Sequence, residues 1–139
     1  MSKKLLGIDV GTGGTRVVLV DSDGRVLHSA TTEHAPIYAA HIGWAEQEPA
    51  DWWRAACASV RACLSESHTN PSEITGIGLS GQMHGLVLLD ANGDVLRPSI
   101  IWCDQRTDAQ CKAITEKIGA RRLIELAANP ALTDRKSVV

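Results

Sequence analysis

Three short runs, the first two largely apolar, occupy the first quarter of the chain and are separated by turn residues. The runs cover residues 5–10, 15–20 and 25–32, and β-branched side chains fill most of the second. Short apolar runs rich in β-branched residues and bounded by turn residues are typical of strands. A Gly-rich turn joins the first two runs and Asp-Ser-Asp-Gly joins the last two. The pattern therefore predicts consecutive strands joined as hairpins, not a strand followed directly by a helix.

The next part of the chain predicts a loop, a helix and a further strand. Residues 34–48 are expected to form a loop, and residues 74–80 a strand. Pro49 suits the first turn of a helix, where its missing N–H is not needed. An apolar stripe then recurs at helical spacing, so this helix is expected to bury one side. The stripe consists of Trp52, Ala56, Val60, Cys63 and Leu64.

The last part of the chain predicts two extended stretches and two helices. Residues 86–90 are expected to form a strand that ends in a hairpin turn, and residues 100–102 a short buried run. Apolar spacing then predicts a helix from about Thr107. A second, shorter helix is expected to stop before Asn129-Pro130, because the residue before a proline avoids helical geometry.

Composition places the chain among ordinary globular proteins. Of its 139 residues 44% are hydrophobic, and 14 basic against 16 acidic residues give a net charge of −2. This balance offers no electrostatic footprint for nucleic acid or an anionic membrane, and the apolar stretches are too short to span a bilayer. No signal-peptide pattern precedes Asp9. We therefore expect a cytoplasmic chain whose four cysteines are small fillers or surface thiols, not disulfides or zinc ligands.

The turn after the first strand carries the most informative chemistry. Residues 9–16 read DVGTGGTR. Glycines let backbone N–H groups approach an anion without hindrance from a Cβ atom, and Arg16 adds a fixed positive charge. Asp9 is a candidate for holding hydrated Mg²⁺ beside phosphates, whereas the alternative is a Gly-rich hairpin with an incidental Asp. The expected phosphate ligands are Gly11, Thr12, Gly13 and Arg16.

A second polar stretch follows the strand expected at 74–80. Residues 80–85 read SGQMHG, and a polar triplet between two glycines at a strand end is costly to pack. Such a loop position favours a binding site. A lone histidine is more often a structural residue, and that alternative stays open for His84.

These stretches resemble two nested groups of known proteins. Residues 8–16 resemble the first phosphate motif of the actin-like ATPase superfamily, and they fit neither the P-loop nor the dinucleotide-binding motif. Residues 79–85 narrow the resemblance to the FGGY carbohydrate kinase family, in particular to its members that act on D-xylulose. The similarity extends to GWAEQEP at 43–49 and to LRPSIIWCDQR at 96–106. It covers residues 4–133 in the family's order.

The resemblance implies a fold and an activity. The fold is α/β, the N-terminal part of a ribonuclease H-like (actin-like ATPase) lobe with a mixed sheet and flanking helices. The activity is phosphate transfer from ATP to D-xylulose, with Asp9 as the catalytic and Mg²⁺-positioning residue. Met83 and His84 would contact the sugar. The full-length protein would have no nucleic-acid or membrane partner, and a homodimer stays open.

Further residues are candidates for the expected sugar pocket, and each has a purely structural role as its alternative. Trp44 is a better pocket candidate than Trp52, which fits the helix stripe. The resemblance places Asp104 and Arg106 near the sugar, whereas their spacing alone fits a surface ion pair equally well.

The resemblance also implies what these residues leave out. The family's catalytic base is an Asp in a later part of its first lobe, and a second lobe closes over the nucleotide. Nothing in the chain matches either, so we expect the 139-residue chain itself to be inactive. Residues 134–139 depart from the family's pattern and can be encoded by a sequencing-adapter sequence, so we expect a non-native tail. Two alternatives remain: an FGGY kinase for another sugar or polyol, and a sugar-binding fragment without turnover.

Overall fold

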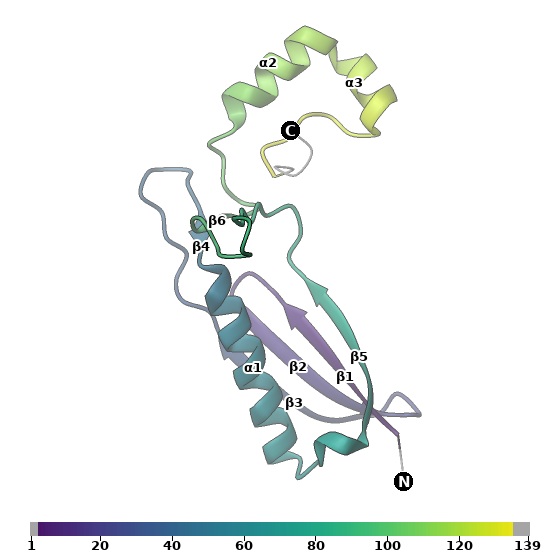
Figure 1. Cartoon of the computed structure of the whole chain (residues 1–139). Helices are drawn as coiled ribbons and strands as arrows, with labels where there is room; N and C mark the ends of the chain where they lie inside the picture. Colours follow the sequence, from purple (N-terminus) through teal and green to yellow (C-terminus); the bar gives the residue numbers. More distant parts are fainter. Residues whose placement is uncertain (1–2, 135–139) are drawn as a thin grey trace. The chain divides into compact units, whose positions relative to one another are not determined.

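The computed structural model describes residues 3–134, which divide into two compact units. The first unit contains the described residues up to 36 together with residues 49–82. The second contains residues 37–48 and the described residues from 83 onward. Each unit is described separately below (Figure 1). Residues 135–139, most of the expected non-native tail, lie outside the described residues.

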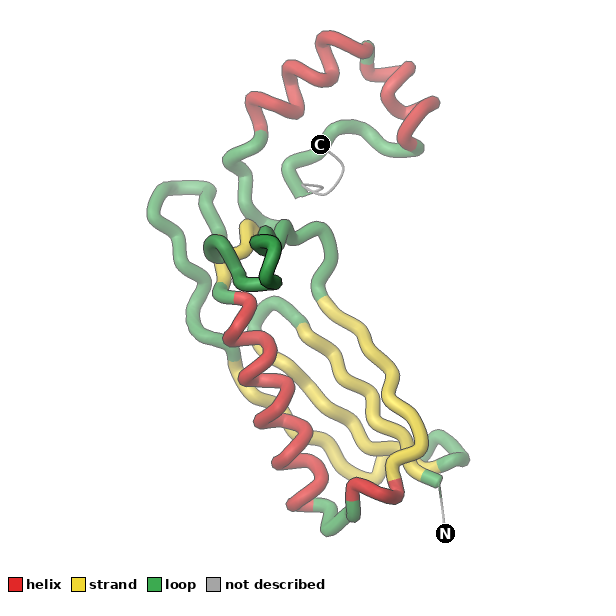
Figure 2. Tube along the Cα trace, viewed as in Figure 1, coloured by secondary structure: helices red, strands yellow, loops and turns green. Residues whose placement is uncertain are grey.

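The first unit is a four-stranded mixed sheet with a helix along one face (Figures 1 and 2). The strand order is β3-β2-β1-β5, and only the pairing of β1 with β5 is parallel. The three expected N-terminal strands and the strand near residue 74 are therefore confirmed. The elements are β1 (Lys4–Val10), β2 (Gly14–Asp21), β3 (Val26–Glu33), α1 (Pro49–Glu66), the 3₁₀ turn η1 (Pro71–Glu73) and β5 (Ile74–Gly81).

The core of this unit follows from strand alternation. Leu6, Val17 and Leu19 are buried on the face of the sheet that meets α1, where Cys63 joins them. Burial raises the pKa of the Cys63 thiol, which keeps it protonated and inert as a small filler. All four cysteines are free, as expected. Partly buried apolar residues complete the core: Ile8, Ala30, Val60, Leu64 and Ile74.

Two of the fully buried residues of α1 lie one position before the residues predicted to be buried. Its fully buried residues are Ala55, Ser59 and Cys63, whereas Ala56 and Val60 are only partly buried. Apolar periodicity missed the true centre because Ser59 is polar. Its hydroxyl is nevertheless satisfied inside the unit by hydrogen bonds.

The second unit is small and rich in loops. A two-residue ladder pairs β4 with β6 in antiparallel fashion, and two helices follow. Both helices are confirmed, but β4 lies inside a stretch that was expected to be loop throughout. The elements are β4 (Glu46–Gln47), β6 (Ser99–Ile100), α2 (Asp108–Ile118) and α3 (Ala120–Ala127).

The strand expected at 86–90 is wrong. Only isolated bridges occur there, between Leu86 and Ile100 and between Leu89 and Val95. The stretch has strand-forming residues but no continuous partner ladder. Its turn is present, since the Gly93 N–H donates to the Asp90 carbonyl at 3.1 Å and Gly93 has a φ of +88°.

Fewer apolar residues are buried in the second unit than its sequence pattern predicted. Ile101 is fully buried, but Trp102, expected in the same buried run, is largely exposed. The buried residue of α2 is Cys111, whereas Ile118 is exposed. No helix in residues 3–134 is long and apolar enough to cross a membrane.

Candidate active site

The Gly-rich turn between β1 and β2 is a tight backbone structure. The Gly11 N–H donates to the Gly14 carbonyl at 3.0 Å. A Cβ atom on Gly14 would lie 2.8 Å from the Thr32 carbonyl oxygen, and one on Gly11 would lie 3.3 Å from the Gly14 oxygen. A Cβ on Gly13 would meet nothing within 4 Å. The turn therefore needs glycine at its two ends for packing, while Gly13 leaves its backbone open.

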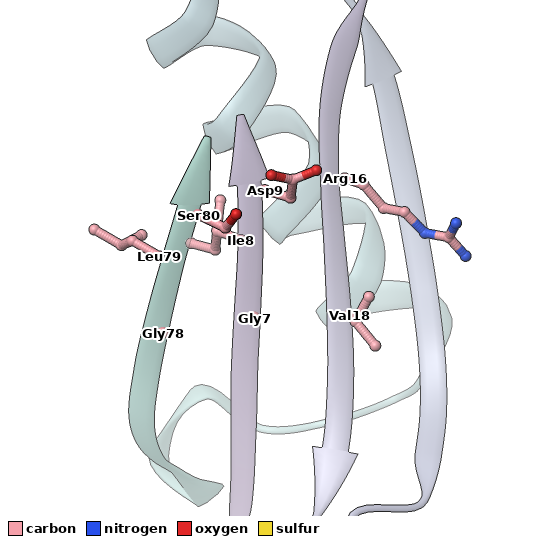
Figure 3. A pocket seen from close by; sticks show the side chains of 8 residues that line it. All are labelled: Gly7, Ile8, Asp9, Arg16, Val18, Gly78, Leu79 and Ser80. Atoms are coloured by element: carbon pink, nitrogen blue, oxygen red, sulfur yellow. The ribbon is translucent and has the colours of Figure 1, made fainter. Parts of the chain in front are cut away.

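Polar side chains mark the end of the sheet next to this turn (Figure 3). The strand register sets Asp9 opposite Arg16 on one side and opposite Ser80 on the other. By strand alternation all three point to the face of the sheet away from α1. Asp9 and Arg16 are exposed there, at the end of an open hollow floored by Gly7 and Gly78. The register thus brings the backbones of Asp9, Arg16 and Ser80 side by side, whereas the Arg16 guanidinium lies 3.5 Å from the Ser29 hydroxyl of β3.

The chemistry of these donors suits a nucleotide-bound cation better than an ion held by protein alone. In the described residues no group of three or more His, Cys, Asp or Glu side chains is arranged to hold a metal. Mg²⁺ usually takes only one or two carboxylates and completes its shell with phosphate oxygens and waters. Asp9 supplies one such exposed carboxylate, so the residues present fit Mg²⁺ bound together with ATP.

Gln82 follows β5 and contacts the turn between β1 and β2, a role that was not predicted for it. Its N–H donates to the Val10 carbonyl at 2.8 Å, and its Oε1 accepts from the Thr12 hydroxyl at 3.3 Å. Gly81 permits this approach, because a Cβ there would lie 3.0 Å from the Val10 oxygen. The Gly81-Gln82 pair at the end of β5 was the sequence feature that could have identified this contact. Only the parallel pairing of β5 with β1 brings Gln82 to the turn.

In the second unit an ionic cluster surrounds Asp104. This carboxylate is fully buried; it accepts from the Ala45 N–H at 2.7 Å and forms a two-pronged pair with Arg106 at 2.6 and 2.9 Å. Arg106 also contacts Glu46 at 2.7 Å, and Arg97 donates to the same Glu46 oxygen. The alternative of a surface ion pair is therefore wrong, because Asp104 has no exposed surface and the Arg106 side chain is 13% exposed.

Hydrogen bonds set the charge state of this cluster. Burial alone would raise the pKa of Asp104, but bonds from the Arg106 side chain and from the Ala45 and Arg106 N–H groups outweigh it and lower that pKa. Burial would likewise lower the pKa of Arg106, but Asp104 and Glu46 raise it. Both groups thus stay charged at neutral pH. Glu46, which the sequence analysis did not single out, is as central to the cluster as Asp104.

Trp44 belongs to the same cluster. The Arg106 guanidinium carbon lies 3.8 Å from the centre of the Trp44 ring, a cation–π contact. His41 meets the ring edge-on with centroids 4.5 Å apart. Trp44 and Asp104 are therefore joined through Arg106, and contact of either with a sugar stays a prediction.

Met83 and His84 follow β5 directly. The Met83 side chain is 70% exposed. His84 is partly buried and has a φ of +63°, a left-handed conformation that few residues other than glycine adopt. Two residues later the Leu86 N–H donates to the Ile100 carbonyl at 3.0 Å, which fixes the loop to β6. The loop thus holds an exposed thioether next to a histidine whose backbone is left-handed.

Fold and turn together define the class. A mixed sheet in the order β3-β2-β1-β5, with α1 on one face and a glycine-rich β1–β2 turn, is the N-terminal part of a ribonuclease H-like lobe of the actin-like ATPase type. Residues 4–134 match the FGGY family of carbohydrate kinases, N-terminal domain, and the chain belongs to that family. The fold class and family expected from the sequence are confirmed.

Individual relatives agree with this assignment. The xylulose kinase of Bacillus subtilis (strain 168) is 39% identical over 130 residues, which are 94% of this chain and 26% of that protein. The crystal structure of a xyloylose kinase from Brucella ovis superposes with a TM-score of 0.84 at 35% identity, covering 94% of this chain and 27% of that one. A gluconate kinase from Lactobacillus acidophilus has a TM-score of 0.80 at 26% identity, covering 90% and 25%. The chain spans about a quarter of the length of these relatives.

Proposed function

We propose that this chain is the N-terminal part of a cytoplasmic kinase that transfers the γ-phosphoryl group of ATP to the 5-hydroxyl of D-xylulose. The observation that carries the proposal is the Gln-Met-His loop after β5 in a chain whose curated relatives are named xylulose kinase. The hydroxyl oxygen attacks the γ-phosphorus, the bond to the bridging oxygen breaks, and ADP leaves. The hydroxyl proton passes to a carboxylate base that the family supplies from a later segment.

The turn after β1 would hold the phosphates. Backbone N–H groups of Gly11, Thr12 and Gly13 would face the anion, and Arg16 would add positive charge. Asp9 would hold the nucleotide's Mg²⁺, which when bound neutralises phosphate charge in the transition state. The exposure of Asp9 and Arg16 at one end of the sheet supports this division of roles.

The loop after β5 would hold the sugar. The exposed Met83 side chain offers apolar contact, and His84 offers a hydrogen-bond partner for a ketose hydroxyl. Trp44 would add an aromatic surface. Asp104 would act as a positioning residue, because its carboxylate is fully buried and bonded to Arg106 and Ala45.

A second candidate is an FGGY kinase for another sugar or polyol. The structural similarity to a gluconate kinase favours it, since the same fold accommodates that enzyme's N-terminal part. Gluconate carries a carboxylate and xylulose does not, so the two candidates differ in which acceptor supports turnover. A non-catalytic sugar-binding role is the third reading.

A hybrid kinase tests these candidates. In it, residues 4–133 replace the matching N-terminal segment of the Bacillus subtilis relative, and ADP release is measured with D-xylulose, gluconate or glycerol as acceptor. We expect turnover with D-xylulose at a kcat/KM at least about tenfold above the other acceptors. Preference for another acceptor would favour the second candidate. A folded hybrid without turnover on any acceptor would favour the third.

A further inference from the structure

A buried polar cluster lies behind the phosphate turn, on the side of the sheet that meets α1. Thr15 and Ser59 are fully buried, His34 is 9% exposed, and Thr32 is partly buried. Ser59, His34 and Thr32 are not among the residues expected to touch phosphate. Buried polar groups are costly unless hydrogen-bonded, so the partners of each group show what the cluster does.

His34 contacts the turn through three of its atoms. Its backbone N–H donates to the Gly13 carbonyl at 3.0 Å. Its ring Nδ1 lies 3.4 Å from the Thr12 carbonyl, and its Nε2 lies 2.9 Å from the Thr15 hydroxyl. A carbonyl oxygen only accepts, so Nδ1 carries the ring proton. When the ring carries its only proton on Nδ1, Nε2 accepts the Thr15 O–H. His34 thus contacts three positions of the turn: Thr12, Gly13 and Thr15.

Ser59 fastens the same turn from the helix. Its Oγ donates to the Thr15 carbonyl at 3.0 Å and lies 2.8 Å from the Thr32 hydroxyl. Because the single Ser59 proton goes to the carbonyl, the Thr32 hydroxyl is the donor of the second bond. Thr15 is thus held at its side chain by His34 and at its backbone by α1.

A turn with three glycines needs such support. Gly11, Gly13 and Gly14 lose more conformational freedom on ordering than other residues would. Within the turn, a hydrogen bond from the Gly11 N–H to the Gly14 carbonyl joins the two ends of the backbone. We propose that His34 is a positioning residue that holds residues 12–15 in the conformation that receives phosphate. This inference rests on the proposed role of the turn, and His34 itself touches no phosphate.

Amide hydrogen exchange in the complete 139-residue chain tests the inference. The Gly11 amide reports on the turn, and the Leu19 amide, at the centre of β2, reports on the fold of the unit. In His34→Ala, Gly11 exchange should rise roughly tenfold while Leu19 exchange changes less than about twofold. His28→Ala is the matched control, because His28 lies on β3, the strand that ends just before His34, and pairs with Glu66 at the surface. An unchanged Gly11 rate in His34→Ala would overturn the proposal.

Two amide substitutions separate positioning from simple filling of space. The amide of Gln reaches the place of the imidazole Nε2, and that of Asn the place of Nδ1. Since the Nε2 bond to Thr15 is the shorter one, His34→Gln should restore Gly11 exchange to within about threefold of the parent, and His34→Asn should not. Equal Gly11 rates in these two variants would overturn the proposal, even if His34→Ala unfolds.

A titration with MgATP separates this inference from the proposed function. The probe is the set of amide chemical shifts of Gly11 and Gly13 in the parent chain and in His34→Ala. We expect MgATP to change both amide chemical shifts in the parent. In His34→Ala we expect this response to be several-fold weaker. Shifts of equal size and midpoint in both would contradict the role of His34. No shift in the parent, together with the expected exchange pattern, would count against phosphate binding by the turn and leave the fastening by His34 established.

Discussion

Asp9 is the exposed carboxylate at the end of β1, and a change of one atom tests its proposed role. Asp9→Asn keeps the shape and removes the charge that would face Mg²⁺. In the hybrid kinase we expect kcat to fall by about two orders of magnitude or more, with little change in the KM for D-xylulose. Steady-state kinetics at saturating ATP measures both constants.

The control for this change is Asp23→Asn, which alters an exposed carboxylate in the turn between β2 and β3. It should leave kcat unchanged. If Asp9→Asn retained a kcat close to that of the parent hybrid, the assigned role would be wrong.

His84 distinguishes a sugar contact from a structural histidine. In the hybrid, His84→Ala should lower kcat/KM for D-xylulose by about ten- to hundredfold, because losing one hydrogen-bond partner costs roughly 1–3 kcal/mol. Hydrolysis of ATP without sugar should hardly change, since the turn at residues 11–16 is untouched. Both rates and the Tm are measured beside the parent.

His68 supplies a matched control, because it is an exposed histidine that also has a left-handed backbone, with a φ of +51° against +63° at His84. His68→Ala should change neither rate. Equal loss of both rates in His84→Ala, with a lower Tm, would make His84 a structural residue. Full activity on D-xylulose would contradict the sugar assignment.

At the scale of elements, Asp51 ties the first turn of α1 to the end of β3. Its carboxylate accepts from the Ala35 N–H at 2.7 Å and from Arg54 at 2.7 Å. The Ala35 bond and Arg54 outweigh partial burial and lower the pKa of Asp51 below its usual value of 3.8. A carboxyl whose pKa is lowered by folding stabilises the fold above its usual value, and that contribution is lost as the pH falls through the lowered pKa.

We therefore expect Asp51→Ala to lower the Tm of the chain by roughly 3–8 °C between pH 5 and 8, equivalent to about 1 kcal/mol. The difference from the parent should shrink below about pH 4 and vanish once both forms are neutral at that position. Thermal melts followed by circular dichroism across this range give the profile. Asp23→Ala is the control, and a Tm difference that did not depend on pH would refute the charge-based explanation.

The ionic cluster ties together the segments of the second unit. Asp104→Asn removes one charge from a buried pair with Arg106, and breaking such a pair costs about 3–5 kcal/mol. We expect the Ile101 amide, which donates to the Ala45 carbonyl at 3.1 Å, to lose protection from hydrogen exchange. The Leu19 amide of the first unit should keep its protection. Asp108→Asn, which alters an exposed pair with Lys112, should change neither amide.

At the scale of the whole molecule, the described chain has the turn and the loop proposed to bind phosphate and sugar, but it spans about a quarter of the length of its relatives. In the family the base and the nucleotide-closing lobe come from later segments. We therefore expect the 139-residue chain alone to give no ADP release with MgATP and D-xylulose in a coupled assay. The hybrid kinase is the positive control. Turnover by the chain above a blank without protein would refute this expectation.

Much of the fold followed from local pattern because its elements are local. Short apolar runs separated by glycine-containing turns identified β1, β2 and β3, and Pro49 marked the start of α1. The strand predicted at 86–90 was wrong because local pattern is not enough there. Strand-forming residues favour extended backbone, but a strand also needs a partner along its length. Ile100 and Val95 provide only single bridges.

The sequence by itself determined the family to which the chain belongs, because DVGTGGTR and GQMHG carry the resemblance that the family match confirms. The phosphate chemistry of the turn stays a prediction from the same residues. Only the tertiary structure decided how these residues are supported. His34, Ser59 and Gln82 reach the turn from 19 or more positions away, as in the contact of Thr15 with His34. The burial of Asp104 and its hydrogen bond from Ala45 were decided in the same way, because hydrogen bonds between distant segments depend on packing and leave no local pattern.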